Sequence, residues 1–571
     1  MTTSLLIKTL LQKKKISRDL IFFSLCMLCF TPAYADEYGN EIAVAPMPTC
    51  DTTIYLKGVR LVSDPDSIDP SGCSCNSIVE ADDLPIFQSE NFKQLIEQYV
   101  GKPLQKKSLF LLTSDIRRYL SNHSVIVSDV IYPEQDVTNG YVQILVLEGK
   151  IGQINIENNR WFSDNLIRNQ IRLTEHSPLN EREITANLDW LNRNPFRRVD
   201  LIYEPGKKRK ETDLTFRVND KFPLRVFTGY DNIGNRFTGF NRIFAGFNWG
   251  NAFGLDHIMN YQYTTNINTR KLQAHNGDYT FPLRWHHLVN IFGAYEQSKP
   301  DSVAPFHMKG QYWQTSGRYI IPFSPRGRFR HEMNVGYDFK SVTNNAFFDV
   351  LSFFNSKYQI SQFNVHYDLF NEDRHGTTVF SVTAVGSPGH MTSHNNTKTF
   401  RKFRDGAVSS YVYGKGVFER KTQMGGSWSY VARLAGQGTW QRLMVSEQMG
   451  MGGIDTVRGF EERDANGDQG WFTNQEIHTP PVSMYKKNSY GHRRDYLYFL
   501  AFYDVGQVFN RRPPPGENHF STLSSAGIGV RYSFQKNIFI RADWGIPISN
   551  SSVNHHTKLP QRVNMVGTFA Y

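Results

Sequence analysis

The stretch MGGIDTVRGFEERDANGDQG, residues 451–470, combines five glycines with Asn and Asp residues around one Val-Arg-Gly-Phe sequence. Glycine and short polar side chains allow the tight backbone turns of a loop between two strands. Further along, residues 502–506 are FYDVG, and Phe502 and Asp504 would share one face of a strand. These two segments predict a loop that carries the cation Arg458 and a strand that carries an acidic residue.

The region around this loop, residues 222–571, has the pattern of short strands joined by polar turns. Leu224, Val226, Thr228 and Tyr230 alternate with Arg225, Phe227 and Gly229, which is the alternation of a strand with two different faces. The chain is 40% hydrophobic and 14% aromatic, yet its mean hydropathy is −0.46 and no run of eighteen apolar residues occurs. At about ten residues per strand plus turns, this region accommodates about sixteen strands of a transmembrane antiparallel β-barrel.

The first 35 residues have the pattern of a secretory signal peptide. Lys13, Lys14 and Lys15 form a basic region, residues 20–30 are apolar, and a small-residue cleavage site ends at Ala35. We expect cleavage before Asp36 and export from the cytoplasm. The segment 36–52 then begins the mature chain.

Three cysteines remain after such a cleavage: Cys50, Cys73 and Cys75. An odd number in an oxidising compartment predicts one disulfide and one free thiol. Cys50 would pair with either Cys73 or Cys75. No His or further Cys lies near the C-x-C pair, so we do not expect a zinc site there.

Residues 53–221 contain two tandem units with the order strand, helix, helix, strand, strand. The first occupies 53–150 and contains a loop-like insertion at about 63–88, rich in Asp, Pro, Ser and Gly. The second occupies 151–221, and in it Ser163 and Asn180 are expected to cap the two helices. Exposed strands at the edges of such small sheets are templates for an extended peptide.

These features together resemble known families. The pair Val-Arg-Gly-Phe and Phe-Tyr-Asp-x-Gly resembles the BamA-like superfamily of outer-membrane barrels, and each repeat resembles a POTRA domain. Residues 147–151, LEGKI, and 191–197, LNRNPFR, are similar to those of two-partner secretion transporters of the TpsB type. The resemblance implies an outer-membrane barrel with two periplasmic POTRA domains, which captures a secreted exoprotein and passes it unfolded to the cell surface without ATP.

The same resemblance implies a site within the barrel. In this family the loop between the eleventh and twelfth strands folds back into the lumen, and its Val-Arg-Gly-Phe motif is matched by residues 457–460: Val457, Arg458, Gly459 and Phe460. Arg458 is expected to pair with Asp504 on the inner wall, with Asp543 as the second candidate. A helical plug of the usual length does not fit the segment 36–52.

Other classes of function find less support in the sequence. The net charge of +11 is typical of nucleic-acid-binding proteins as well as polar lumens, but no recognition motif accompanies it. Asp464, Asn466 and Asp468 begin like a calcium loop, yet Gln469 stands where that pattern requires glycine. We therefore expect no enzyme activity, cofactor, metal or nucleic-acid partner.

Two other membrane functions remain as alternatives: a BamA-like insertase, which usually has more POTRA domains, and a passive porin, which would not need any. Residues 387–402 and 511–520 are expected to be extracellular loops. The last strand, with Phe569 and Tyr571 facing lipid, resembles the signal recognised by the barrel assembly machinery. The identity of the exoprotein does not follow from the sequence.

Overall fold

The computed structural model describes residues 53–81, 84–123, 127–208, 210–236, 238–300, 306–348, 351–485, 494–549 and 561–571. It divides into two compact units, Met1–Leu112 with Tyr132–Leu145, and Thr113–Ile131 with Val146–Tyr571. The expected signal peptide, its cleavage between Ala35 and Asp36, and the segment 36–52 lie outside the described residues. None of the described helices is both long enough and apolar enough to cross a membrane.

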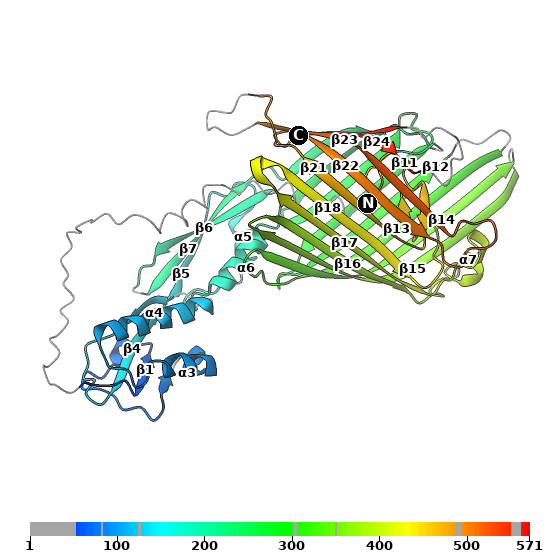
Figure 1. Ribbon diagram of the computed structural model, residues 1–571. Helices are drawn as coiled ribbons and strands as arrows, with labels where there is room; N and C mark the ends of the chain where they lie inside the picture. Colours follow the sequence, from blue (N-terminus) through cyan, green and yellow to red (C-terminus); the bar gives the residue numbers. More distant parts are fainter. Residues whose placement is uncertain are drawn as a thin grey trace. The chain divides into compact units, whose positions relative to one another are not determined.

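The first small domain has the expected order strand, helix, helix, strand, strand, with one additional short strand, β2(Val79–Ala81), after the first strand (Figure 1). Its sheet has the strand order β2-β1-β4-β3. Ser89 caps the first helix, because its hydroxyl accepts a hydrogen bond from the backbone N–H of Phe92, and Phe92 and Ile96 are fully buried. The elements are β1(Gly58–Val62), α3(Glu90–Glu97), α4(Lys106–Asn122), β3(Val127–Ile131) and β4(Tyr141–Glu148).

The expectation of a plain loop at 63–88 was wrong in part. The segment contains an edge strand, β2(Val79–Ala81), which pairs in parallel with β1, and two short 3-10 turns, η1(Pro65–Ser67) and η2(Pro85–Gln88). Phe87 in the second turn is fully buried. A strand of three residues is too short to show the alternation that identifies strands in a sequence.

The same segment carries Cys73 and Cys75, which are buried free thiols. Burial is the main cause that raises the pKa of the Cys75 thiol to about 12, so the reactive thiolate is disfavoured. Cys50 lies outside the described residues, and its pairing with either thiol stays a prediction.

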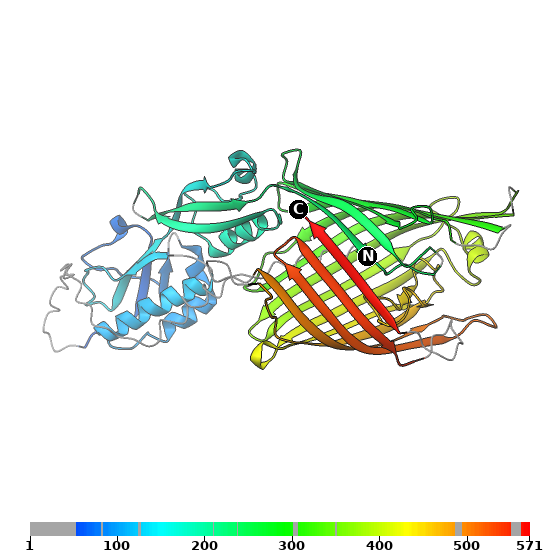
Figure 2. The same ribbon diagram turned by 90° about the horizontal axis from the view of Figure 1, so that it is seen from above.

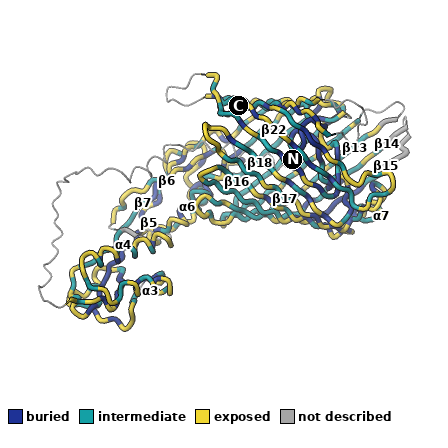
Figure 3. The backbone as a smooth tube through the Cα atoms, in the orientation of Figure 1, coloured by how far each residue is buried: buried dark blue, intermediate teal, exposed yellow. Residues whose placement is uncertain are grey.

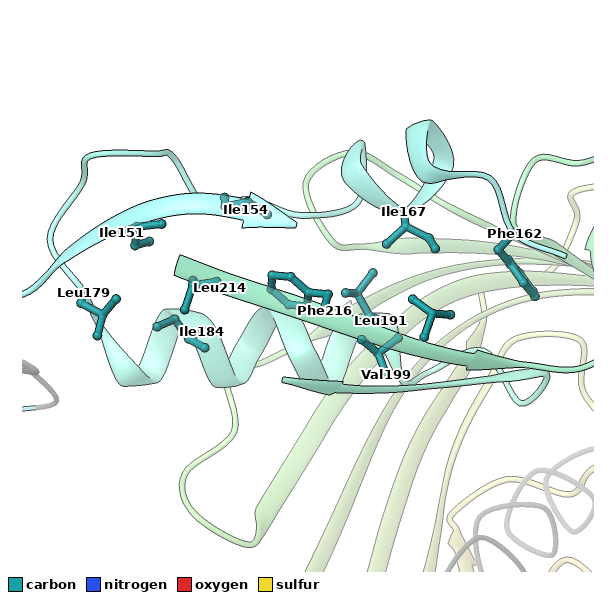
Figure 4. Packing of buried hydrophobic residues seen from close by; sticks show 11 residues of the cluster. Ile151, Ile154, Phe162, Ile167, Leu179, Ile184, Leu191, Val199, Leu214 and Phe216 are labelled. Carbon is teal, nitrogen blue, oxygen red and sulfur yellow. The ribbon is translucent and has the colours of Figure 1, made fainter. Parts of the chain in front are cut away.

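The second small domain repeats the order strand, helix, helix, strand, strand with the sheet order β5-β7-β6. Ser163 and Asn180 cap its helices as expected, because their side chains accept hydrogen bonds from the first-turn amides. Figure 4 shows the side chains of both helices and all three strands meeting in one apolar core. The elements are β5(Lys150–Glu157), α5(Asp164–Arg168), α6(Glu181–Leu191), β6(Arg197–Pro205) and β7(Glu211–Asp220).

Sixteen strands of the described residues close into an antiparallel barrel, as predicted (Figures 1 and 2). The last strand pairs with the first, with Phe569 opposite Thr228. The strands are β8(Leu224–Asp231), β9(Arg242–Ala252), β10(His257–Asn266), β11(Leu272–Pro282), β12(Leu288–Ser298), β13(Phe306–Pro322), β14(Phe329–Phe348), β15(Leu351–Asp373), β16(Gly376–Ser387), β17(Tyr411–Gln423), β18(Ser429–Thr439), β21(Gln469–His478), β22(Asp495–Phe509), β23(Phe520–Phe534), β24(Ile538–Pro547) and β25(Arg562–Ala570).

The two faces of these strands differ in chemistry. Figure 3 shows exposed and less exposed residues alternating along the strands. Large apolar side chains are exposed on the outward face, among them Val226, Ile291, Trp313, Val563 and Phe569. The inward face carries mostly polar and charged residues, so the barrel has the apolar exterior and polar lumen of a membrane barrel.

The barrel has two rims. At the first, which we call the domain-side rim, β8 begins and the chain ends at Tyr571; the other is the far rim. At the far rim, residues 387–402 are not only a polar loop, because they contain most of α7(Thr397–Phe403). Asn396 caps this helix, and Phe400 is fully buried against Tyr358. This helix was not predicted from the sequence, because the Asn and Thr residues at its start also favour turns.

The second small domain contacts the domain-side rim through residues of its LNRNPFR segment. Arg197 donates two hydrogen bonds of 2.8 Å to Asp256 in the turn between β9 and β10, and Asn194 donates a third of 2.8 Å. In the next turn, the ring of His286 stacks on Trp190, and its Nε2 lies 2.8 Å from the carbonyl oxygen of Gln170. Buried, hydrogen-bonded ion pairs of this kind fix orientation between packed parts of a chain.

Phe216 is a large, fully buried apolar side chain in the core of the second small domain. We predict that Phe216→Ala destabilises this domain by about 3–5 kcal/mol, because it leaves a cavity in a packed core. Limited proteolysis of the full-length protein should show faster cleavage between residues 149 and 221. The exposed neighbour Arg217 on the same strand supplies the control, and equal cleavage of Phe216→Ala and Arg217→Ala would contradict the predicted packing.

Candidate functional site

The candidate site is the segment 440–468, which we call the lumen loop. It connects β18 and β21, the eleventh and twelfth strands of the barrel, and contains the short strands β19(Met449–Met451) and β20(Ala465–Gly467). Its apolar residues Met451, Val457, Phe460 and Ala465 pack in one cluster with side chains of β18 and β21–β23. The loop therefore folds against the inner wall of the barrel.

Arg458 at the tip of the lumen loop is 1% exposed and meets Asp504 of β22, which is fully buried. Its Nε and Nη2 atoms donate hydrogen bonds of 2.8 and 2.7 Å to the two carboxylate oxygens of Asp504. Its backbone N–H donates a further bond of 3.0 Å to the same carboxylate. This bidentate pairing fixes both the position and the orientation of the arginine.

Two more acidic residues complete the surroundings of Arg458. Its Nη1 donates a hydrogen bond of 2.6 Å to Glu476 of β21 and lies 3.9 Å from Asp543 of β24. The guanidinium also lies 3.6 Å above the ring centre of Phe502, a cation–π contact. A buried cation needs this many partners, because its loss of hydration is otherwise uncompensated.

Two glycines make this close approach of loop and wall sterically feasible. Gly459 has φ +110°, which side chains other than glycine rarely adopt. A Cβ atom at Gly545 of β24 would lie 2.6 Å from the backbone nitrogen of Gly459 and 2.8 Å from the carbonyl carbon of Arg458. The Val-Arg-Gly-Phe backbone is thus in contact with the strand behind it.

Further ion pairs hold the tip of the lumen loop on either side of Arg458. Arg541 of β24 donates hydrogen bonds of 2.6 Å to the carbonyl of Ile454 and 3.1 Å to the carboxylate of Asp455. Arg236, in the turn between β8 and β9, donates a bond of 2.8 Å to Glu461. Carboxylates of the loop thus meet cations of the barrel.

A second attachment lies on a distant part of the wall. Glu447 of the lumen loop has a side chain only 1% exposed, and the Nζ atom of Lys340 on β14 lies 2.8 Å from its carboxylate. Tyr413 of β17 and Gln362 of β15 donate further bonds of 2.8 and 3.2 Å to it. In the barrel, β15, β16, β17, β18 and β21 separate β14 from β22. The loop is therefore fixed to two widely separated sections of the inner wall.

At the far rim, Asp468 ends the lumen loop as a fully buried carboxylate. It accepts hydrogen bonds from Arg404 next to α7 and from the backbone N–H groups of Leu443 and Arg511, the last two at 2.9 Å each. Arg442 and Arg404 both pair with Glu517 in the turn between β22 and β23. These pairs connect three segments of the far rim.

The residues predicted from the sequence can now be placed relative to Arg458. The structure brings Val457, Arg458, Gly459 and Phe460 together with Asp504, whereas Asp543 bonds chiefly to Arg531 and Arg541 and lies at the edge of the Arg458 cluster. Sequence reasoning missed Glu476, which alternation places on the same face of β21 as Asn474. It also missed Lys340 and Glu447, which are 107 residues apart in sequence.

Comparison with known families identifies these parts. Residues 210–532 match the model of the haemolysin secretion/activation protein family ShlB/FhaC/HecB. Residues 77–149 match the ShlB-type POTRA domain, and residues 149–221 match the POTRA model described as surface antigen variable number repeat.

Individual relatives and one solved structure match this chain over most of its length. The chain is 23% identical over 500 residues to a heme/hemopexin transporter protein HuxB of Haemophilus influenzae, covering 84% of each. It is 22% identical over 446 residues to the outer membrane transporter CdiB of Dickeya dadantii, covering 76% of this chain and 75% of the relative. The structure of CdiB from Escherichia coli superposes with a TM-score of 0.75 at 16% identity, covering 93% of each chain.

We predict that Lys340→Met and Glu447→Gln each destabilise the docked lumen loop by about 3–5 kcal/mol, because each leaves a buried charge without its partner. The double variant should recover most of this loss, since both charges are then removed together. The temperature at which the purified protein loses its folded mobility in electrophoresis measures the effect. Lys357→Met on the neighbouring strand is the control, and strictly additive losses in the double variant would contradict direct pairing.

Proposed function

The chain belongs to the haemolysin secretion/activation protein family ShlB/FhaC/HecB, and we propose that it exports one partner exoprotein through the barrel whose lumen loop is described above. It is an outer-membrane transporter of two-partner secretion, with POTRA domains on the periplasmic side. The domain-side rim accordingly faces the periplasm and the far rim faces the cell exterior. The insertase alternative is disfavoured, because the matching family and the relatives are secretion transporters.

The division of labour that we propose follows the domains. Residues 53–150 and 151–221 act as POTRA domains that capture the exoprotein, and residues 222–571 form the transport barrel. Capture by added strands is supported by the sheet orders β2-β1-β4-β3 and β5-β7-β6, which leave strands at the edges. The edge strand β6 also exposes Tyr203, an aromatic side chain suited to contact with an extended peptide.

Within the barrel, the pair of Arg458 and Asp504 holds the lumen loop in the arrangement that conducts the exoprotein. The observation that carries this proposal is the complete burial of both partners with three hydrogen bonds between them. Transport in this proposal involves no covalent chemistry by the barrel and no nucleotide. Folding of the exoprotein outside the cell would prevent its return.

Two further partners belong to the proposal: the lipid of the outer membrane and the barrel assembly machinery. The exposed apolar residues of the outward face contact lipid, with Val563, Met565 and Phe569 of the last strand among them. This terminal strand is the segment through which the barrel assembly machinery would recognise the chain before insertion. Both assignments rest on the apolar exterior of the closed barrel.

Deletion of the gene tests the proposed function. We predict that the deletion strain loses one large surface or secreted protein while its other outer-membrane proteins keep their amounts, and that the wild-type gene restores it. Proteomics of the cell surface and medium measures this. Depletion of many barrel proteins would indicate an insertase instead, and an unchanged surface would contradict the proposal.

We predict that Arg458→Ala and Asp504→Ala each reduce export of that protein at least about tenfold. A loss of only ~1.4 kcal/mol of docking free energy shifts the ratio of docked to undocked lumen loop by that factor. Immunoblots of the medium, normalised to the folded barrel in the membrane, measure export. Arg463→Ala is the matched control, because Arg463 bonds to carbonyl oxygens of the loop itself. Wild-type export by both variants would refute the role of the pair.

A further inference from the structure

One section of the inner wall differs in chemistry from the rest. Five neighbouring strands, β9 to β13, present carboxamide side chains on their inward faces, all half-buried. The outward faces of the same strands carry large apolar residues such as Ile291 and Trp313. We call this section the amide wall; its carboxamides are Asn248, Asn260, Gln262, Asn276, Asn290 and Gln314.

The register of the strands places these side chains in one continuous patch. Asn248 lies opposite Asn260, and Gln262 lies opposite Asn276. Hydroxyl groups fill the spaces between them, since Asn290 donates a hydrogen bond of 2.7 Å to Thr280 directly across the strand pair. Gln314 similarly donates a bond of 2.7 Å to Ser316 along its own strand. The patch is therefore a layer of neutral donors and acceptors.

The inward faces of β11 and β12 also carry two acidic residues, Asp278 and Glu296. Asp278 of β11 accepts hydrogen bonds of 3.0 Å from Asn260 and 3.4 Å from Asn290. The cation at the border of the amide wall, Arg318 of β13, donates to Asp338 of β14. Asp278 and Arg318 thus have partners, and Glu296 lies at the border of the wall, opposite Ala274 and Tyr312. The surface that the carboxamides offer to the lumen is chiefly uncharged.

The lumen loop uses the other part of the wall. Hydrogen bonds and ion pairs join it to β14, β15, β17, β18, β21, β22 and β24. Those strands carry many charged inner residues, including Arg433, Glu476, Asp504 and Asp543. The attachments of the loop and the amide wall therefore occupy different sections of the barrel.

We propose that the exoprotein in transit lies in an extended conformation along the amide wall and exchanges backbone hydrogen bonds with its carboxamides. This inference rests on the proposed function, because it identifies where in the barrel that transport takes place. The carboxamides would contact the peptide backbone of the exoprotein, so this contact does not depend on the sequence of the exoprotein.

The chemistry of the wall fits such a partner. A carboxamide offers the same N–H donors and carbonyl acceptor as a peptide group. Neutral hydrogen bonds contribute little net free energy in contact with water, whereas a pair of opposite charges in a lumen of reduced dielectric is held several times more strongly. A path for passage needs contacts that form easily and break easily. Neutral amides make contacts that both form and break easily. Charged side chains on the wall would instead hold oppositely charged side chains of the exoprotein.

Site-specific photo-cross-linking in the full-length transporter tests the proposal. A benzophenone amino acid is placed at Asn276 or Gln314 of the amide wall, in cells that export the surface protein identified by the deletion strain. Val431, on the inward face of β18 next to Arg433, is the control within the lumen, and Ile291 is the control on the outward face. We expect adducts with the exported protein from 276 and 314, and adducts at neither control.

The outcomes separate this inference from the proposed function. Export with adducts at Val431 and none at 276 or 314 would overturn the amide wall and leave the transporter function intact. Absence of any exported protein that depends on the gene would overturn the proposed function itself. Each cross-linker variant is first shown to be folded in the membrane and to export the protein.

A second measurement does not depend on cross-linking. Asn276→Lys is expected to slow export about tenfold, equivalent to ~1.4 kcal/mol, because a fixed charge retains acidic segments and repels basic ones. Asn276→Ser keeps a neutral hydrogen-bonding group and is expected to export at the wild-type rate. Equal export by the two variants, with equal amounts of folded barrel, would contradict the proposal.

Discussion

A guanidinium group buried in the middle of a membrane barrel has lost most of its water, and that loss must be compensated by the protein. In this chain three acidic residues, Asp504 of β22, Glu476 of β21 and Asp543 of β24, surround Arg458. Two cations of the wall, Arg531 and Arg541, pair with Asp543 and bring further positive charge to this acidic cluster. The position of the lumen loop depends on these pairs, because withdrawing Arg458 from them would leave buried carboxylates without their cation.

The other contacts of the lumen loop follow the same principle. Most of its carboxylates meet a cation of the wall or of a neighbouring turn, as Glu447 meets Lys340 and Glu461 meets Arg236. The scattered arginines and lysines that make the chain basic are thus in part counter-charges for an acidic loop. Many charged pairs lie where the loop is attached, and the section formed by β9 to β13 is lined chiefly by neutral amides and hydroxyls. This segregation gives one barrel both a firmly held loop and a surface of low affinity.

Much of the fold could be predicted from the sequence, because it depends on local patterns. Alternation identified the barrel strands, helical spacing and caps such as Ser163 identified the POTRA helices, and the order of elements was confirmed. The edge strand Val79–Ala81 and helix α7 were missed, since short elements rich in turn-forming residues lack a periodic signal. The meeting of Arg458 with Asp504 was predicted only through the family resemblance.

The other contacts of the site could not be predicted from the sequence, because they form only when the barrel closes. Lys340 and Glu447 come together only because sixteen strands form a ring and a long loop folds back across it. In the sequence, each is one charged residue among many. The amide wall is likewise invisible in any single strand, where one or two Asn or Gln residues are ordinary. It becomes a feature when the register places Asn248, Asn260 and their neighbours side by side.

A high-resolution structure of the full-length transporter in a lipid bilayer tests the central claim most directly. The account predicts residues 440–468 inside the barrel, with both carboxylate oxygens of Asp504 within hydrogen-bonding distance of Arg458. A lumen loop outside the barrel, or Arg458 in contact with water while Asp504 pairs with another cation, would contradict it.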